Sequence, residues 1–340
     1  MRGLKYLLAM TALSVVHSGA ANAQKVLPTA SCINTGNHLE VGKDAGLGNS
    51  KLTPDDFSNI RGAGFQSIRM PVNWSRHLEK DGSGTINAAW LDLVQKKVDE
   101  ALAADLTVVM NSHYFETVHS DPDIGGKMLA KAWEQIALRF AAYPENRLFF
   151  EIENEPHDKL NNSNLMETLG ASLTAIRASN PTRTVVIGGE NWSGVDSLAT
   201  LELPDDPNVH PTFHYYEPFD FTHQGASWVG DHPPPLGRHY GTDADRARLA
   251  ADVEKVRQYI TRTGKTPFMG ENGAYEIVPM EERIAYHRAV ADAFRPLGIT
   301  PCIWAYTNTF PFYDGETHTW HPGLREATGI NVAKDKGEEK

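Results

Sequence analysis

The stretch LFFEIENEPH, residues 148–157, joins an apolar run to an amide, a carboxylate and a proline. Aromatic and β-branched residues are typical of a buried strand, and Pro156 cannot donate a hydrogen bond to a neighbouring strand. We therefore predict a short strand that presents Asn154 and Glu155 at its C-terminal end.

Three glutamates alternate along this stretch, at Glu151, Glu153 and Glu155. If the strand's two-residue period holds, they share one face, where like charges are destabilising unless a cation or a site requires them. A solvated acidic loop is the alternative interpretation. A second candidate strand end, PFMGENGAY at residues 267–275, favours a site because it carries another carboxylate, Glu271.

Around these two stretches the chain alternates strand and helix patterns. Strands are predicted at 32–35, 65–70, 106–111, 148–155, 184–188, 211–214, 267–270 and 301–305. Helices are predicted at 54–61, 88–104, 127–143, 165–179, 243–263 and 280–294, with a short one near residue 324. Eight strand-then-helix units predict a single-domain α/β fold, a (β/α)₈ TIM barrel.

Polar and aromatic residues occur where the predicted strands end. They are Arg69, His113, Glu155, Trp192, His214, Glu271 and Trp304. Barrel enzymes keep their sites on the face formed by the C-terminal ends of the strands. The pattern therefore favours a barrel over an open doubly wound sheet, and the chain has no glycine-rich dinucleotide or phosphate-binding motif.

The two ends of the chain differ from the rest in composition. Residues 1–23 have a basic start, a short apolar run and an Ala-Asn-Ala ending, the pattern of a signal peptide cleaved after Ala23. The apolar run is shorter than the roughly 20 residues that span a bilayer. We expect a secreted or periplasmic protein with a catalytic domain at 24–332 and a disordered charged tail at 333–340.

The formal net charge of −11 disfavours nucleic acid and anionic membranes as partners. It suits a neutral substrate, and we expect a monomer. His210 and His214 are four residues apart, but on a strand this spacing does not direct both side chains to one ion, and no His-Glu-x-x-His motif occurs. We expect no metal and no organic cofactor.

Cys32 and Cys302 fall on the first and eighth predicted strands, which become neighbours when a barrel closes. A disulfide is therefore possible in an exported protein. Adjacent parallel strands rarely present side chains at angles suitable for a disulfide, and a buried free thiol is compatible with apolar surroundings. On this ground we expect two free thiols.

Two carboxylates on different strands, surrounded by aromatic and hydrogen-bonding side chains, suit glycoside hydrolysis. One carboxyl must be a protonated acid and the other an ionised nucleophile or base. Arg69 is the cation expected to keep one glutamate ionised.

These residues resemble glycoside hydrolase family 5, the cellulase-type clan of retaining (β/α)₈ enzymes, and bacterial endo-β-1,4-glucanases in particular. The similarity extends over nearly the whole chain after residue 23. It rests on Cys32–Asn37, Arg69, His113, the Asn154-Glu155-Pro156 motif, His214 with Tyr216, the segment 214–228, Gly270–Tyr275 and Trp304.

The resemblance implies a role for each of these residues. Glu155 is expected to be the general acid and base and Glu271 the nucleophile that forms a covalent glycosyl intermediate. Asn154 is expected to bond the sugar 2-hydroxyl. The remaining expected substrate-binding residues are Asn34, Arg69, His113, Tyr114, Trp192, His214, Tyr216, Trp228 and Trp304.

Some positions depart from the family pattern or have a second interpretation. Tyr114, Asn272 and Glu153 stand where many relatives have His, Phe and an apolar residue, and the sequence offers no explanation for Glu153. Arg69 and the two histidines also suit a structural ion pair and core packing. Exposed aromatics such as Trp192, Trp228 and Tyr275 either contact sugar or cover the barrel rim.

The expected activity is a retaining endo-β-1,4-glucanase, or cellulase, acting on a β-glucan polysaccharide or oligosaccharide. An endo-β-mannanase, xyloglucanase or lichenase of the same family is the enzymatic alternative. A catalytically silent glycan-binding barrel is the other class, and the presence of both Glu155 and Glu271 argues against it.

Overall fold

The computed structural model describes residues 27, 29–41 and 52–330. The predicted signal peptide, residues 1–23, and the predicted tail, residues 333–340, lie outside these ranges. Within them, no helix is both long enough and apolar enough to span a bilayer.

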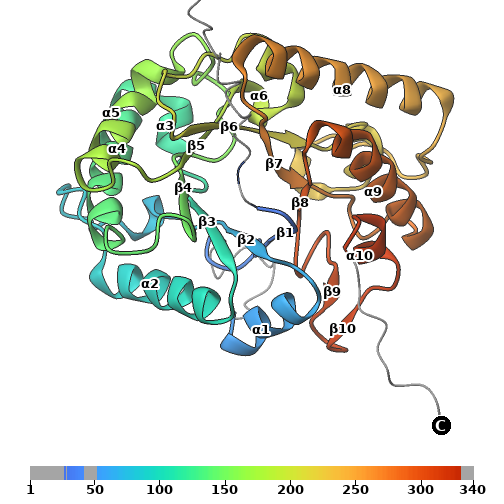
Figure 1. Cartoon of the computed structure of the whole chain (residues 1–340), viewed down its shortest axis with the longest axis horizontal. Coiled ribbons are helices and arrows are strands. Elements are labelled where there is room, and N and C mark those ends of the chain that lie inside the picture. Colours follow the sequence, from blue (N-terminus) through green and yellow to red (C-terminus); the bar gives the residue numbers. More distant parts are fainter. Residues whose placement is uncertain (1–26, 28, 42–51, 331–340) are drawn as a thin grey trace, which may run out of the picture.

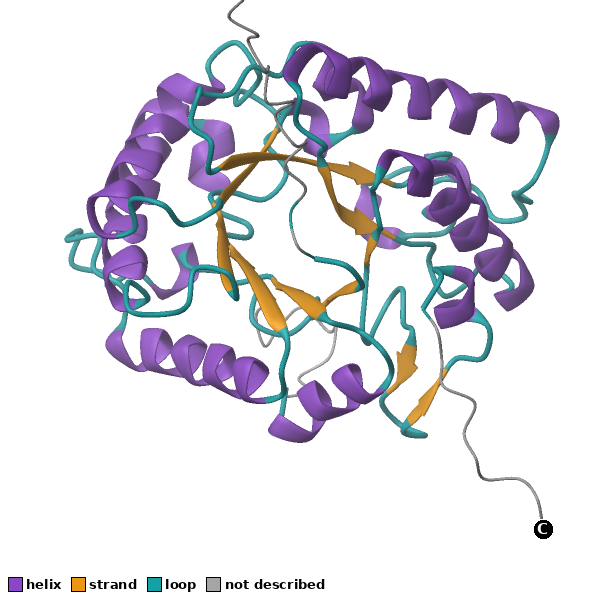
Figure 2. Ribbon diagram, viewed as in Figure 1, coloured by secondary structure: helices purple, strands orange, loops and turns teal. Residues whose placement is uncertain are grey.

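Strands β1 to β8 pair in sequence order, all in parallel, and β8 pairs back onto β1 to close a barrel. Figure 2 shows the strands as a ring with the helices outside it. The strands are Cys32–Asn34 (β1), Ser67–Met70 (β2), Thr107–Asn111 (β3), Leu148–Glu151 (β4), Val185–Gly188 (β5), Val209–Tyr215 (β6), Phe268–Asn272 (β7) and Cys302–Ile303 (β8). The predicted fold is confirmed.

The principal helices cover the outside of the barrel (Figure 1). They are Pro54–Gly62 (α1), Ala88–Ala103 (α2), Pro122–Arg139 (α4), Leu165–Ser179 (α5), Asp243–Thr263 (α8) and Met280–Phe294 (α9). Short helices occupy Glu116–Ser120 (α3), Glu190–Ser193 (α6), Phe219–Thr222 (α7) and Leu324–Ala327 (α10), and a separate hairpin pairs Tyr313–Asp314 (β9) with Thr319–Trp320 (β10). The predictions for α5, α8 and α9 match these bounds.

Helix α4 begins five residues before the predicted start at residue 127. Asp121 caps it by accepting a hydrogen bond from the Ile124 amide, and Pro122 takes the first helical position. Gly125 lies inside this helix because a Cβ there would collide with the backbone of α3. The adjacent Gly126 lies against Thr168 of α5, so the two consecutive glycines let α4 pack closely on both α3 and α5.

The barrel interior below the site is filled by side chains from several strands. This layer contains Leu27, Cys32, Val109, Phe149, Val186, Phe268 and Cys302, all buried. A larger core lies between the barrel and its helices. The site therefore rests on a packed floor, and water does not run through the barrel.

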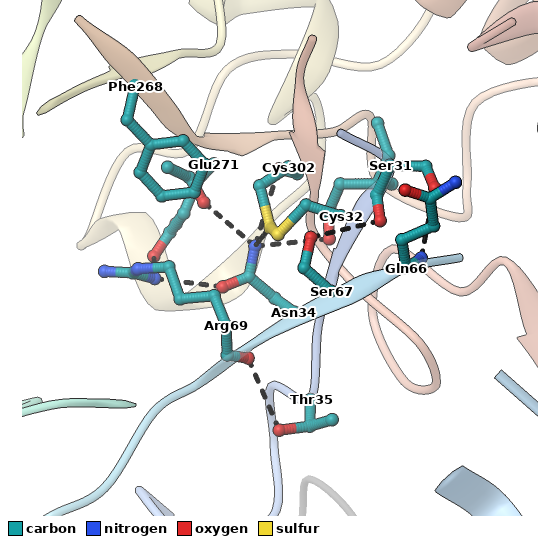
Figure 3. The surroundings of a disulfide bond; sticks show 12 residues. Ser31, Cys32, Asn34, Thr35, Gln66, Ser67, Arg69, Phe268, Glu271 and Cys302 are labelled. Carbon is teal, nitrogen blue, oxygen red and sulfur yellow. Dashed lines mark hydrogen bonds and ion pairs between the residues drawn. A yellow bond between two sulfur atoms is a disulfide. The ribbon is translucent and has the colours of Figure 1, made fainter. Parts of the chain in front are cut away.

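The expectation of two free thiols is wrong: Cys32 and Cys302 form a disulfide (Figure 3). The two residues are direct partners in the β1–β8 register, with Cα atoms 4.3 Å apart. Both side chains point into the barrel, where curvature makes inward side chains of neighbouring strands converge. A flat parallel sheet lacks this curvature, and its neighbouring side chains do not converge in the same way.

Strand β4 ends at Glu151, so the prediction that three glutamates share one strand face is also wrong. Glu151 and Glu153 are buried and Glu155 is partly buried. Glu155 has a left-handed backbone with φ of 50°. Each of the three carboxylates consequently faces different surroundings.

Candidate active site

Arg69 lies at the bottom of the site, fully buried, on β2. Its Nε and Nη2 donate to the two carboxylate oxygens of Glu151 at 2.7 and 2.8 Å, a bidentate ion pair across the barrel. Its Nη1 donates to Oε1 of Glu271 at 2.6 Å. The same guanidinium also donates to Oδ1 of Asn34 and Oδ1 of Asn154, at 3.0 and 2.6 Å.

In this network Nε, Nη1 and Nη2 of Arg69 all donate to oxygen acceptors. Burial alone would lower the pKa of Arg69, but the carboxylates of Glu151 and Glu271 raise it above the usual range. The guanidinium is therefore a permanent cation, and it fixes the positions of side chains from strands β1, β4 and β7 and from the loop after β4.

Asn34 at the end of β1 connects this network to β7 and β8. Its Nδ2 lies within hydrogen-bonding distance of the carbonyl oxygens of Gly270 and Ile303, at 3.0 and 3.2 Å, and 3.5 Å from Sγ of Cys302. Figure 3 shows Asn34 between the disulfide and Arg69. Asn34 is thus a buried positioning residue at the barrel seam.

Glu271 accepts hydrogen bonds on both oxygens. Oε1 accepts from Arg69, and Oε2 accepts from the Tyr216 hydroxyl at 2.8 Å. His214 Nδ1 lies 3.6 Å from Oε2 of Glu271 and 2.7 Å from Oε1 of Glu155. The imidazole of His214 therefore lies between the two carboxylates that the sequence singled out.

Glu155 approaches Glu271 from the loop after β4. Ligand atoms of Glu155, His214 and Glu271 all lie within 4.8 Å of one another. Burial raises the pKa of Glu155 to about 7 and lowers the pKa of His214 to about 4. His214 is therefore neutral near neutral pH, where Glu155 exchanges its proton.

Three further predicted residues line this centre. The Trp304 ring is nearly parallel to that of His113, with ring centroids 5.8 Å apart, and Tyr114 packs edge-on against His113. The Trp304 ring also lies against Gly36, where an added Cβ would come within 2.7 Å of it. Asn111 Nδ2 lies 3.2 Å from Nδ1 of His113, which leaves Nε2 of His113 as the protonated nitrogen.

The two exposed tryptophans lie farther out. Trp192 is 54% exposed and stacks on His157, whereas Trp228 is 44% exposed and packs edge-on against Tyr275. Among the interactions of the described residues, neither tryptophan contacts Glu155 or Glu271. The structure thus brings together every predicted site residue except these two, which occupy the rim.

A family comparison agrees with this arrangement. Residues 28–310 match the model of the family described as cellulase (glycosyl hydrolase family 5). The chain belongs to glycosyl hydrolase family 5. Endoglucanase H of Acetivibrio thermocellus is 30% identical over 300 residues, which cover 86% of this chain and 32% of that protein. The family 5 chain thus spans about a third of the length of this relative.

Solved structures align with the family 5 chain over most of the length of both proteins. Thermotoga maritima Cel5A in complex with cellobiose has a TM-score of 0.84 at 33% identity, and the same protein in complex with mannotriose has a TM-score of 0.83 at 32% identity. Each alignment covers 88% of this chain and 97% of the other. The family model and the solved structures therefore agree on both the fold and the family.

Sequence reasoning assigned no function to Glu151 or Glu40. Glu151 is the main partner of Arg69, and a carboxylate at the end of an otherwise apolar buried strand is a signal that a counterion lies nearby. Buried Glu40 accepts hydrogen bonds from the backbone amides of Asn37 and His38. It thereby shapes the loop after β1, and no pattern in the sequence points to it.

Proposed function

We propose that this chain is a secreted endo-β-1,4-glucanase that cleaves internal bonds of β-1,4-glucan with retention of anomeric configuration. Glu271 is the nucleophile and Glu155 the general acid and base. The observation that carries the proposal is the unequal setting of two neighbouring carboxylates. Glu271 accepts hydrogen bonds from the cation Arg69 and from the Tyr216 hydroxyl, whereas Glu155 is hydrogen-bonded to the neutral imidazole of His214.

The spacing of the carboxylates supports a retaining mechanism. Oxygens of Glu155 and Glu271 lie within 4.8 Å of each other. Retaining glycosidases hold their carboxyl groups about 5 to 5.5 Å apart, whereas inverting ones need about 6.5 to 9.5 Å to admit a water molecule. A sugar carbon fits between these two groups, and an additional water does not.

The local charges decide which carboxyl holds the proton. Burial raises the pKa of both glutamates, and two carboxyl groups this close cannot both ionise easily. The permanent cation Arg69 donates to Glu271 directly and, together with the hydrogen bond from the Tyr216 hydroxyl, lowers the pKa of Glu271. The single proton of the pair therefore resides on Glu155, which suits an acid beside an ionised nucleophile.

The reaction then takes two steps. A carboxylate oxygen of Glu271 bonds to the anomeric carbon as the glycosidic C–O bond breaks, and Glu155 gives its proton to the departing oxygen. Glu155, now ionised, takes a proton from water, whose oxygen bonds to the anomeric carbon as the bond to Glu271 breaks. The enzyme returns to its initial protonation state.

Other side chains serve the same sugar. Trp304 forms a platform beside His113, and Asn154 is held by Arg69 where it can bond the 2-hydroxyl. Tyr114, Trp192 and Trp228 extend the surface on which neighbouring sugars would lie. We propose no metal: the Glu155, His214 and Glu271 cluster has a composition that can ligate metal, but its groups are those required for the hydrolysis.

The substrate is tested with carboxymethylcellulose, mixed-linkage β-glucan, xyloglucan and mannan, by measuring new reducing ends. We expect release from carboxymethylcellulose and an early β-configured product by NMR. Mannan is a second candidate because the similar Thermotoga maritima Cel5A binds mannotriose as well as cellobiose. An α-configured first product, or no release from any of the four, contradicts the proposal.

The roles are tested with two alanine variants. Glu155→Ala should keep much of the first-step rate on 2,4-dinitrophenyl β-cellobioside, whose leaving group needs no acid, and azide should restore turnover. Glu271→Ala should lose activity on this substrate and on glucan alike. Equal losses on both substrates in Glu155→Ala, without an azide effect, refute the assignment.

Export and a monomeric state complete the proposal. Bacterial endoglucanases among the relatives and the composition of residues 1–23 support export. N-terminal sequencing of the protein recovered from culture medium or periplasm should begin at Gln24, and light scattering should give the mass of one chain. A protein that keeps Met1 in the cytoplasm contradicts the first expectation.

A further inference from the structure

Glu153 has no place in the reaction described above, although it lies two residues before Glu155. Its side chain is completely buried. Oε1 accepts a hydrogen bond from the Phe115 amide at 3.1 Å and lies 3.3 Å from Nε2 of His119 on α3. A buried carboxylate requires such partners, and a buried pair of this kind contributes little net stability compared with apolar residues. Its presence thus calls for a reason other than stability.

The His119 ring begins a stack that leads to the acid and base. It lies parallel to the ring of His157, with centroids 3.9 Å apart and an interplanar angle of 15°. His157 in turn stacks on Trp192, at 5.0 Å and 9°. The three rings connect the buried carboxylate of Glu153 to the rim of the site.

His157 also contacts the backbone of Glu155 directly. Its Nδ1 lies 2.6 Å from the Glu155 carbonyl oxygen. Because a carbonyl oxygen only accepts, Nδ1 carries the hydrogen, and this bond selects the tautomer of His157. The orientation of one imidazole therefore determines where the Glu155 carbonyl points.

The backbone at Glu155 needs such support. Its φ of 50° lies in the left-handed region, which costs a non-glycine residue energy unless the surroundings hold it. The neighbouring residues are fixed too: the Asn154 amide donates to the Ser112 carbonyl at 2.8 Å, and the Trp192 amide donates to the Pro156 carbonyl at 3.1 Å. The bond from His157 fixes the residue between them.

We propose that Glu153, His119 and His157 are positioning residues that aim the Glu155 carboxyl at the leaving-group oxygen. Glu153 orients His119 by a hydrogen bond, His119 orients His157 by stacking, and His157 holds the Glu155 carbonyl. This inference rests on the proposed role of Glu155 as general acid. It also accounts for a charged residue at a position where the family resemblance leads one to expect an apolar one.

The test uses aryl β-cellobiosides whose leaving groups differ in pKa. Acid assistance contributes about 10² to 10⁴ in rate when the leaving group is poor, and little when it is good. A misdirected Glu155 therefore lowers kcat/KM for the phenyl glycoside and spares that of the 2,4-dinitrophenyl glycoside. A general loss of structure lowers both in the same proportion.

His157→Phe is the sharpest variant, since it keeps a ring between His119 and Trp192 but removes the donor to Glu155. We expect kcat/KM for the phenyl glycoside to fall about 10-fold to 100-fold, and that for the dinitrophenyl glycoside less than about 3-fold. Glu153→Leu should show the same split. Glu153→Gln, which keeps an acceptor for the Phe115 amide and His119, should recover most of the lost activity.

Asp252→Asn is the matched control. Asp252 is a fully buried carboxylate on α8 that pairs with Arg248 and Lys255 and accepts a hydrogen bond from the Tyr215 hydroxyl. Among the interactions of the described residues, it contacts neither Glu155 nor the three positioning residues. It should lower stability without any dependence on the leaving group. If Glu153→Leu does not fold, His157→Phe still decides the question.

The outcomes separate the two proposals. Suppose that Glu155→Ala lowers kcat/KM far more for the phenyl than for the dinitrophenyl glycoside, whereas His157→Phe lowers kcat/KM equally for both substrates or for neither. The positioning role is then overturned and the acid role of Glu155 stands. If Glu155→Ala itself shows no split, both proposals fall. A split in His157→Phe and Glu153→Leu, with recovery in Glu153→Gln, supports the positioning role.

Discussion

Reducing the disulfide between Cys32 and Cys302 should destabilise the protein strongly while leaving its activity at 25 °C nearly intact. The bond joins residues 270 positions apart, so it closes almost the whole described chain into one loop. Loop-closure entropy for such a length is about 19 cal/mol/K, or about 5.6 kcal/mol at 25 °C, and real disulfides typically deliver about 2 to 5 kcal/mol. We expect a loss of about 3 to 5 kcal/mol in the free energy of unfolding.

Activity should change less than about two-fold under the same reduction. Asn34 and Trp304 each lie two residues after a cysteine, Trp304 just beyond the end of β8. Asn34 nevertheless keeps its bonds to the Gly270 and Ile303 carbonyls without the cross-link. Trp304 keeps the hydrogen bond from its amide to the Asn272 carbonyl, at 2.8 Å. The barrel hydrogen bonds therefore hold the site once the protein is folded.

The assay is urea unfolding followed by tryptophan fluorescence, with and without dithiothreitol. The Cys32→Ala, Cys302→Ala double variant is the control: reductant should lower the wild-type midpoint towards that of the variant and leave the variant unchanged. Two thiols labelled in unfolded, unreduced wild-type protein refute the bridge. An equal unfolding free energy with and without reductant refutes the entropic reasoning.

Four further changes test the electrostatics and the rim. Arg69→Met should lower the free energy of unfolding in urea by about 3 to 5 kcal/mol, because it leaves buried Glu151 without its cation. Adding Glu151→Met should restore part of that free energy. An Arg69→Met variant as stable as the wild type contradicts this expectation. Because burial raises the pKa of Glu155 to about 7 and the acid must be protonated, kcat/KM on glucan should fall as the pH rises above about 7; an alkaline limb that begins only above pH 9 contradicts this. Burial also raises the pKa of Glu40 from 4.5 to about 7, so the folded state holds the proton of Glu40 more tightly than the unfolded state does. The resulting stabilisation is present below pH 4.5 and is lost as the pH rises to 7, so the unfolding free energy should decrease over this range. Glu40→Gln should remove this decrease from a plot of unfolding free energy against pH. Trp228→Ala should raise KM for long glucan about five-fold, because about 1 kcal/mol of stacking on the sugar is lost. The kcat for an aryl cellobioside should not change. A variant in which only kcat falls argues against sugar binding by Trp228 at the rim.

Much of the fold follows from local patterns. Eight apolar segments, seven of them followed by a predicted helix, are sufficient to predict the barrel, because strand and helix periodicities are local properties of the chain. The C-terminal ends of parallel strands meet on one face of a barrel. Hence the positions of Arg69, His214 and Glu271 in the sequence already placed them in one site.

The extent of each element depended on packing that the local pattern does not contain. Helix α4 begins at Pro122 because Asp121 caps it and Gly125 fits against α3. Strand β4 ends at Glu151, four residues before Glu155, because pairing with β5 stops there. A period-2 argument cannot detect where a neighbouring strand ceases to pair.

What the sequence by itself determined is the set of chemical groups and the face on which they meet: two carboxylates, an arginine, histidines and aromatics at strand ends. Only the tertiary structure decided their pairings. Arg69 binds Glu151 as well as Glu271, Glu153 pairs with His119, and Cys32 bonds to Cys302. The physical reason is that these contacts cross between elements far apart in the chain, so they depend on the curvature and twist of the closed barrel.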